Sequence, residues 1–202
     1  MSGPSVAHEA GFGPYTVLDL HDLPEDGKGF ELEDGWLVEV AGGARHHWVA
    51  RNVSRILEVA ATDAGASVIV CVGGEWEIST PAGIRKPDVF VIPRGVARAA
   101  IIEESPKVIP GREVLLAVEV VSSGSSSERT DRVRKVGEYA AVGIPQYWIV
   151  DHQPDPRVLV LRLNEQGYFA KPTAKAGTLL VTEIKADKPF TVSFDPAALL
   201  EF

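Results

Sequence analysis

One nearly continuous apolar run constrains the fold of this chain more than any other feature. Residues Val114–Val121 read Val-Leu-Leu-Ala-Val-Glu-Val-Val, without the polar alternation of a half-exposed strand. Such a run is typical of a strand that is covered on both faces. A helical pattern and a second short apolar run, Gln146–Asp151, follow it. This order predicts an α/β (α+β) protein in which helices flank a central mixed sheet.

Two amphipathic helices are expected to pack on that sheet. An apolar stripe at helical spacing predicts the first, from about His46 to Ala64, with Gly65 as its stop. Its stripe consists of Val49, Val53, Ile56, Leu57 and Ala60. The second helix is expected from about Ser126 to Val142, because Gly143 and Pro145 end it.

Short strands and turns account for much of the remaining chain. The turn at Asp34-Gly35 predicts a hairpin over Gly29–Val40, and Gly73-Gly74 predicts one that joins Ser67–Val72 to Glu75–Thr80. Further expected strands are Pro87–Ile92, Val158–Leu163 and Gly167–Lys171, with a last helical turn near Pro196–Leu200. Residues 94–112 are polar and contain proline, and are expected to form a connection.

The chain length favours a single domain over residues 1–202. We expect a flexible segment at 1–14, a core at about 30–151 and a β-rich extension at 152–202. Cys71 is the only cysteine, which excludes a disulfide scaffold. No stretch reaches the roughly 18 apolar residues of a membrane span. Because Met1–Gly13 also lacks a signal-peptide pattern, a cytoplasmic protein without a membrane partner is expected.

The net charge of −8 argues against a basic nucleic-acid coat protein, but its location matters. The first 40 residues contain nine acids and one lysine, so they carry all of this excess. Residues 41–202 are neutral overall. We interpret the acidic segment as a solvated surface layer.

Two carboxylates in apolar strands are candidates for metal binding. Glu119 lies near the end of the buried run, where an unpaired carboxylate is costly. Asp88 precedes another strand, and the two converge if these strands are neighbours. Hard oxygen ligands of this kind suit Mg²⁺. A strand-end Glu119 that pairs with a basic neighbour explains the pattern equally well.

The helix after Glu119 adds a candidate lysine. Asp131, Lys135 and Tyr139 follow one another at intervals of four residues and share a helix face. In isolation, Asp131 and Lys135 suggest an ordinary surface ion pair. Alternatively, Lys135 points back at Asp88 and Glu119, where it could orient a water molecule and offset phosphoryl charge.

Taken together, these residues resemble the Uma2 family, which belongs to the PD-(D/E)XK superfamily of restriction-endonuclease-like nucleases. The resemblance covers about residues 30–151. It includes Pro87-Asp88, Glu119-Val120-Val121-Ser122, Asp131-x-x-x-Lys135-x-x-x-Tyr139 and Gly143-Ile144-Pro145-Gln146-Tyr147-Trp148-Ile149-Val150-Asp151. Val121 stands where the superfamily has a lysine, and Lys135 on the following helix takes that lysine's place.

This resemblance implies a Mg²⁺-dependent endonuclease that hydrolyses DNA, with Mn²⁺ as a possible substitute. Asp88, Glu119 and the backbone carbonyl of Val120 would hold the metal, and Lys135 would position the attacking water. Supporting contacts are expected from Glu31, Glu39, His46, Asp131 and Tyr139. DNA is expected to approach on the side of Arg85, Lys86, Arg129 and Arg132, away from most N-terminal acids, and cutting of both strands would imply a homodimer.

Two alternatives from other classes remain open. The first is a non-catalytic module that binds DNA or a protein through the nuclease fold, which the neutral body of the chain allows. The second is a metal-dependent phosphohydrolase that acts on a small substrate at the same site. The intact set of Asp88, Glu119 and Lys135 favours the nuclease over both.

Overall fold

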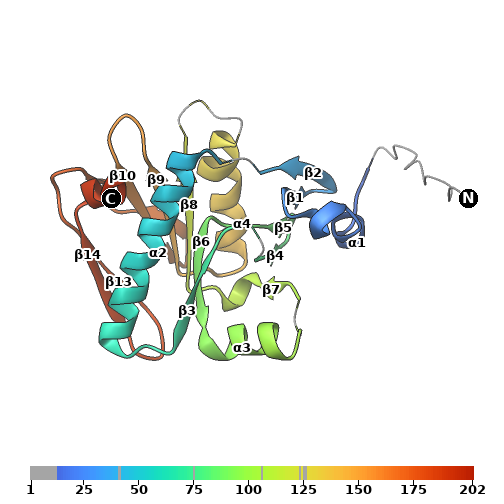
Figure 1. Cartoon of the computed structure of the whole chain (residues 1–202), viewed down its shortest axis with the longest axis horizontal. Coiled ribbons are helices and arrows are strands. Elements are labelled where there is room, and N and C mark those ends of the chain that lie inside the picture. The colour runs from blue at the N-terminus through green and yellow to red at the C-terminus, as the bar shows by residue number, and fades with distance from the viewer. Residues whose placement is uncertain (1–12, 41, 75, 106, 123, 125–126) are drawn as a thin grey trace, which may run out of the picture.

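A mixed sheet forms the centre of the molecule (Figure 1). The computed structural model describes residues 13–40, 42–74, 76–105, 107–122, 124 and 127–202, so most of the segment expected to be flexible, residues 1–14, lies outside the described residues. The central sheet has the strand order β11-β10-β9-β8-β6-β3, and β12 pairs with β10. Its strands are β3 (Val68–Val72), β6 (Val89–Pro93), β8 (Leu116–Val121), β9 (Gln146–Asp151), β10 (Arg157–Asn164), β11 (Gly167–Ala170) and β12 (Ala174–Lys175).

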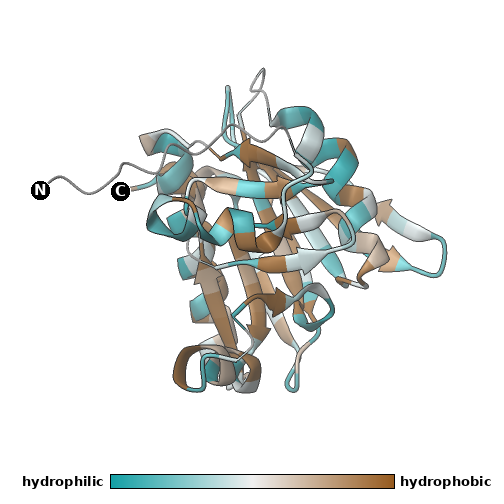
Figure 2. Ribbon diagram, turned by 90° about the vertical axis from the view of Figure 1, so that its right-hand side faces the viewer, coloured by the Kyte–Doolittle hydropathy of each residue, from teal (hydrophilic) through white to brown (hydrophobic). Residues whose placement is uncertain are grey.

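The two apolar runs form adjacent parallel strands in the middle of this sheet. All six residues of β8 are buried, and β9 runs parallel beside it with Glu119 opposite Ile149. The central strands are accordingly brown, the colour of hydrophobic residues, in Figure 2. The expected α/β architecture with a central mixed sheet is therefore confirmed.

Helices cover both faces of the sheet. On one face, α2 (Ala44–Ala64) packs on Leu116, Val118 and Val120 of β8. The strands β13 (Leu180–Ile184) and β14 (Phe190–Phe194) form a separate hairpin against α2, followed by the 3-10 turn Pro196–Leu200. On the other face lie α3 (Arg94–Ile102) and α4 (Lys135–Ala141).

The first helix ends as its sequence predicts. Gly65 adopts a left-handed conformation with φ of +65° directly after α2, which a residue without a side chain adopts at little cost. The second expected helix is less regular. Ser126, its expected start, lies outside the described residues, and a π-helical turn (Thr130–Arg134) precedes α4.

A second, five-stranded sheet lies beside the first, in the order β2-β1-β5-β4-β7. It consists of β1 (Phe30–Glu33), β2 (Trp36–Glu39), β4 (Ile78–Thr80), β5 (Gly83–Arg85) and β7 (Ile109–Pro110). The expected hairpin around Asp34-Gly35 is confirmed as β1 and β2. The short helix α1 (Val17–His21) packs Leu20 against Leu32 and Ile84 of this sheet, and the 3-10 segment Pro24–Gly27 follows it.

The hairpin expected around Gly73-Gly74 is wrong. β3 pairs antiparallel with β6 in the central sheet, whereas β4 pairs with β5 and β7 in the smaller one. Gly73 and Gly74 both have positive φ, and the chain crosses between the two sheets there. Pairing of β3 with the apolar β6 buries more hydrophobic surface than pairing with the polar β4 would, and burial outweighs the local turn signal.

The polar connection expected over residues 94–112 contains two structured segments. Its first part forms α3, which buries Ala97 and packs Val96 and Ala100 against the core. Its last part contains β7 and the 3-10 turn Gly111–Glu113. This helix is hard to recognise in the sequence, because only a narrow stripe of small residues touches the sheet. The arginines and the adjacent Pro93 give the segment the polar, proline-containing character of a connection. None of the described helices has both the length and the apolar character needed to cross a membrane.

Candidate active site

The two predicted metal ligands meet at one edge of the central sheet. β6 and β8 pair antiparallel with Val89 opposite Val118, so Asp88 at the start of β6 lies beside the end of β8. Oδ2 of Asp88 accepts a hydrogen bond of 2.7 Å from the backbone N–H of Val120. A cavity of about 110 Å³ opens here. Its lining includes Asp88, Glu119, Val120 and Lys135, together with Glu31, Glu39, His46 and Asp131.

Strand alternation determines which face of the sheet Glu119 occupies. Val118 and Val120 pack in the core beneath α2, so the side chain between them projects to the opposite face, toward α4. There Oε1 of Glu119 accepts hydrogen bonds from Nζ of Lys135 at 2.9 Å and from the hydroxyl of Tyr139 at 2.8 Å. Glu119 is 4 % exposed, so it is held in place by these two donors in a nearly dry environment.

Lys135 lies among three carboxylates. Besides Glu119, its Nζ contacts Oε1 of Glu31 and Oδ1 of Asp131, each at 3.1 Å. Burial acts to lower the pKa of Lys135, but Glu119 and Glu31 outweigh burial and raise the pKa well above its usual value. Lys135 and Asp131 are buried, so their contact is part of this cluster and not the surface ion pair that the isolated helix suggests.

The carboxylates of the cluster respond to burial and charge in different ways. Burial raises the pKa of Glu119 well above its usual value, and Asp131 and Asp88 add to the shift while Lys135 opposes it. Burial also raises the pKa of Asp131. For Glu31, burial is again the largest single influence, but Lys135 and Arg85 together outweigh it and lower the pKa. Burial therefore favours the protonated forms of Glu119 and Asp131, whereas the neighbouring cations favour the ionised form of Glu31.

An irregular helical turn carries Asp131 into this cluster. Residues Thr130–Arg134 form a π-helix, which adds a residue to the turn and is frequent at functional sites. The backbone carbonyl of Asp131 accepts a hydrogen bond of 2.8 Å from the hydroxyl of Tyr147. Tyr147 of β9 therefore anchors the turn that presents Asp131 and leads into Lys135.

His46 contacts Asp88, one of the two predicted metal ligands. It lies in the first turn of α2, and its Nε2 is 3.1 Å from Oδ2 of Asp88. Burial acts to lower the pKa of His46, but the neighbouring Asp88 carboxylate outweighs burial and raises it. Glu39, also a predicted supporting residue, is exposed at the mouth of the cavity.

The donor set fits a hard divalent cation. Across the described ranges, no three His, Cys, Asp or Glu side chains converge tightly enough to hold a metal ion alone. Mg²⁺ does not need such a cage, because it commonly takes one or two carboxylates and keeps several waters. The contacts described above use Oδ2 of Asp88 and Oε1 of Glu119, which leaves the other oxygen of each carboxylate for a ligand.

Two predicted DNA-binding residues must be corrected. Arg85 is fully buried, and its guanidinium is bonded to Glu138 on α4 and to Glu31 and Glu33 on β1. Lys86 is also buried, where its Nζ lies 2.6 Å from the carbonyl of Gly27 and 3.2 Å from Glu77. Neither side chain is free to meet a phosphate, because both neutralise carboxylates inside the protein.

The interpretation of the N-terminal acids as a solvated layer is also wrong in part. Glu31 and Glu33 of β1 are buried, and Glu31 lines the cavity itself. They are accommodated there because Arg85, Lys135 and Arg134 contact them. The N-terminal hairpin is consequently a wall of the cavity.

The remaining predicted basic residues lie near the π-helical turn. Arg129 is exposed. Arg132 is half-buried and forms ion pairs with Glu128 and Asp151. Glu138, which binds Arg85, was not predicted as a site residue, although it lies three residues after Lys135 on the same helix. The contact of 2.9 Å between Oγ of Ser122 and Nε2 of His152 was not predicted either; these residues follow the adjacent strands β8 and β9.

Comparisons with known proteins identify a family and a similar fold. The family model "Uma2: Putative restriction endonuclease" matches residues 17–184. A solved structure with a similar fold is that of "a putative nuclease belonging to DUF820 from Anabaena variabilis ATCC 29413". It shares 17 % sequence identity with this chain at a TM-score of 0.57, over 79 % of this chain and 86 % of that one. No curated protein matches the chain significantly.

Proposed function

The chain belongs to the Uma2 family of nuclease-fold proteins, and on that premise we propose that it is a metal-dependent endonuclease that hydrolyses phosphodiester bonds in DNA. The observation that carries the proposal is the buried pair of Glu119 and Lys135 beside Asp88. Burying these charges costs stability, and a purely structural role would be served as well or better by apolar residues. Their convergence in one cavity supports a chemical role.

The proposed metal ligands are Asp88, Glu119 and the backbone carbonyl of Val120, with Mg²⁺ as the ion and Mn²⁺ as a substitute. When bound, the ion would lower the pKa of a water molecule and offset charge on the phosphate. The protein's own residues hold these ligands in place. Val120 N–H orients Asp88, and Tyr139 and Lys135 orient Glu119.

Lys135 is proposed to position the attacking water and to offset charge that develops on the phosphoryl oxygens. Glu31 and Asp131 hold its ammonium group within the cavity, and the raised pKa keeps that group protonated. A protonated lysine acts here as a hydrogen-bond donor and not as a general base. This assignment predicts that substitution of Lys135 lowers kcat more than it weakens DNA binding.

The size of the cavity favours a polymeric substrate. At about 110 Å³ it is well below the roughly 300–1,000 Å³ of pockets that enclose a small-molecule ligand. A single phosphate group could enter it while the rest of a DNA strand remains outside. The exposed Arg129 lies one residue before the π-helical turn and is proposed to contact the DNA backbone.

A plasmid-cleavage assay tests the proposal. Purified protein is incubated with supercoiled, linear and single-stranded DNA in Mg²⁺, in Mn²⁺ and in EDTA. We expect metal-dependent cleavage that Glu119→Gln and Lys135→Ala each reduce by about 10²–10⁴-fold. Glu165→Gln, at the exposed turn between β10 and β11, is the matched control and should cleave normally. Circular dichroism verifies that each variant folds.

Other outcomes distinguish the alternatives. Cleavage that survives both substitutions would contradict the assignment of the site. Salt-sensitive DNA binding without cleavage in either metal would identify a non-catalytic module instead. Hydrolysis of a small phosphodiester without cleavage of DNA would indicate a small-molecule phosphohydrolase.

A further inference from the structure

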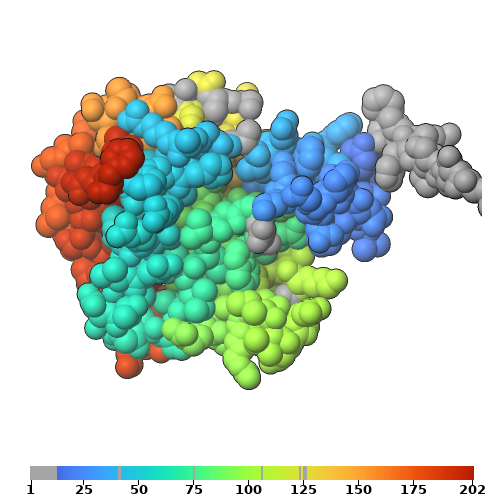
Figure 3. Space-filling view, viewed as in Figure 1, coloured from blue at the N-terminus to red at the C-terminus, as the bar shows by residue number. Residues whose placement is uncertain are grey.

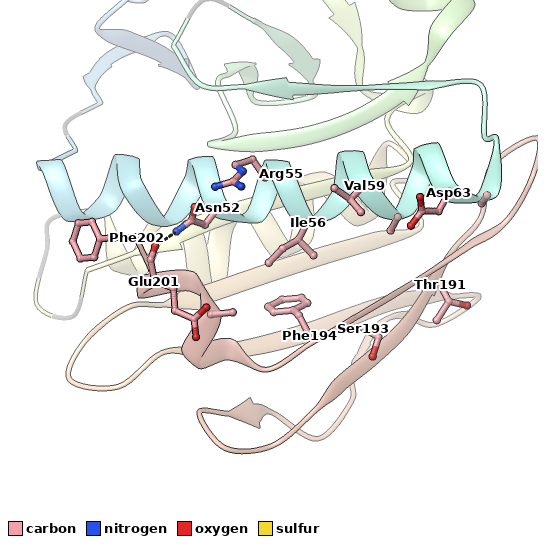
Figure 4. A pocket seen from close by; sticks show the side chains of 13 residues that line it. Asn52, Arg55, Ile56, Val59, Asp63, Thr191, Ser193, Phe194, Glu201 and Phe202 are labelled. Atoms are coloured by element: carbon pink, nitrogen blue, oxygen red, sulfur yellow. Dashed lines mark hydrogen bonds between the residues drawn. The ribbon is translucent and has the colours of Figure 1, made fainter.

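A groove of about 760 Å³ shares no lining residue with the cavity of the candidate site. It runs between α2 and β14 and ends at the C-terminal residues. Figure 3 shows α2 and the C-terminal strand and turn side by side on one open face of the molecule. Ile56 of α2 and Phe194 of β14 face each other across the groove in Figure 4. Its floor is therefore apolar, although it is open to solvent.

Three exposed side chains form a row along the helix beside this groove. Arg55, Val59 and Asp63 are spaced four residues apart and line up along α2 in Figure 4. Val59 is 60 % exposed, which is unusual for an apolar side chain in the middle of a long helix. Among the described residues, no ion pair involves Arg55 or Asp63.

We propose that a second copy of this chain docks on this face, with Val59 of each copy at a twofold axis. A twofold interface requires a surface that is complementary to itself. The row meets this condition, because Arg55 and Asp63 lie at equal distances on either side of Val59. When two α2 helices pack antiparallel about Val59, Arg55 of each copy faces Asp63 of the other, while Val59 and Ile56 bury apolar surface between the pairs.

The charge pattern favours a second copy of this chain over an unrelated peptide as the partner of this face. An unrelated peptide could fill an apolar groove, but it would not need opposite charges placed symmetrically about one exposed valine. The order of charges also selects the antiparallel arrangement. In a parallel pair of helices, Arg55 would face Arg55 and Asp63 would face Asp63, which is repulsive.

This arrangement separates the two candidate sites. His46, which borders the site, lies 13 residues before Val59 on the same helix. At a rise of about 1.5 Å per residue, the two His46 residues would lie up to about 40 Å apart, at opposite ends of the helix pair. The two candidate sites of the proposed dimer would therefore lie too far apart to act on neighbouring phosphates of one DNA duplex.

Sedimentation velocity and light scattering over the micromolar range test the proposal. The full-length protein is expected to be a dimer, and Val59→Arg is expected to be a monomer, because two arginines would meet at the axis. Ile101→Arg is the matched control. Ile101 on α3 is 58 % exposed, like Val59, but lies away from the groove, so this variant should remain a dimer.

Charge reversal then tests the register of the two helices. Arg55→Asp alone and Asp63→Arg alone each create two repulsive pairs, and each should weaken dimerisation by at least about tenfold. An equimolar mixture of the two variants creates two attractive pairs and should restore a heterodimer. This rescue requires folded proteins and depends on no enzymatic activity, so its result is independent of the nuclease proposal.

Three results would overturn the proposal. A wild-type protein that stays monomeric at these concentrations would show that a second copy of this chain does not dock on this face. A dimer that survives Val59→Arg would place the interface elsewhere. Failure of the mixed charge variants to associate would exclude the antiparallel register.

Discussion

The two faces of the central sheet are both buried, but they are built from different chemistry. Both faces have an apolar core, and under α2 the strands present valine, leucine and tryptophan to it. Toward α4, the same strand β8 presents Glu119 to Lys135, and Glu31 and Asp131 complete a buried charged cluster. Apolar burial stabilises a fold, whereas buried charge stabilises it little or not at all. The contrast indicates that apolar packing accounts for the first face, whereas the charged cluster on the second face needs a different explanation, which we propose is chemistry.

Removal of Arg85 is expected to have the largest effect on stability. Arg85→Met keeps the bulk of the side chain but leaves Glu138 without its ion-pair partner and removes one counter-charge from Glu31 and Glu33. Loss of one partner of a buried ion pair typically costs about 3–5 kcal/mol. Urea unfolding should show this loss for Arg85→Met. Arg85→Lys, which retains the charge without the bidentate contact, should lose less, and equal loss in both would mean that packing and not charge matters here.

A cavity on the apolar face is expected to cost about 3 kcal/mol. Leu57→Ala removes a fully buried side chain of α2, and such substitutions cost about 2–5 kcal/mol. Unlike a change in the charged cluster, it should lower the free energy of unfolding without changing kcat well below the melting temperature. A parallel loss of kcat would show that the two faces are coupled through β8.

The stability contributed by Glu31 should depend on pH. Its pKa in the folded protein is below the ordinary value of 4.5, because Lys135 and Arg85 outweigh the effect of burial. Its contribution is therefore complete above about pH 4.5 and is lost as the pH falls through the lowered pKa. Wild-type protein should exceed Glu31→Gln in stability at neutral pH by about 1.5–3 kcal/mol, the range for a hydrogen-bonded charge.

Urea unfolding of both proteins across a pH series measures this difference. The gap should narrow below about pH 4.5 and should not widen there. A gap that is independent of pH would mean that Glu31 acts through packing or geometry and not through its charge.

The smallest effect on stability is expected for an exposed ion pair that lies on neither buried face of the central sheet. Arg98 and Glu103 of the α3 region are 3.8 Å apart, with side chains 71 % and 60 % exposed. Arg98→Ala should change the free energy of unfolding by less than about 1 kcal/mol, since exposed pairs contribute little. Thermal unfolding at low and high salt would detect a larger role.

Much of the fold could be predicted where one element's own pattern decides its structure. The stripe from Val49 to Ala60 and the Gly65 stop predict α2 closely, and the two apolar runs predict β8 and β9. Predictions failed where a strand could pair with either of two segments. A glycine pair after β3 signals a local hairpin, but the partner of β3 is β6, some 20 residues away in sequence.

The candidate site was predicted in part for the same reason. Asp88, Glu119 and Lys135 could be identified because a charged residue within or beside an apolar pattern can be recognised from the sequence alone. Arg85 and Lys86 were misplaced, because their sequence cannot show which carboxylates surround them. The carboxylates around Arg85 come from β1 and α4, which are separated from it by about 50 residues on either side.

The sequence by itself determined the alternation of β8, and with it that Glu119 projects to the face opposite Val118 and Val120. It also determined that Asp131, Lys135 and Tyr139 share one side of a helix. Only the tertiary structure decided that β1 closes the cavity and that Glu31 and Glu33 are buried by Arg85. The physical reason is that periodicity records the direction of a side chain, whereas the charge state and partners of a buried group depend on distant segments brought within a few ångströms.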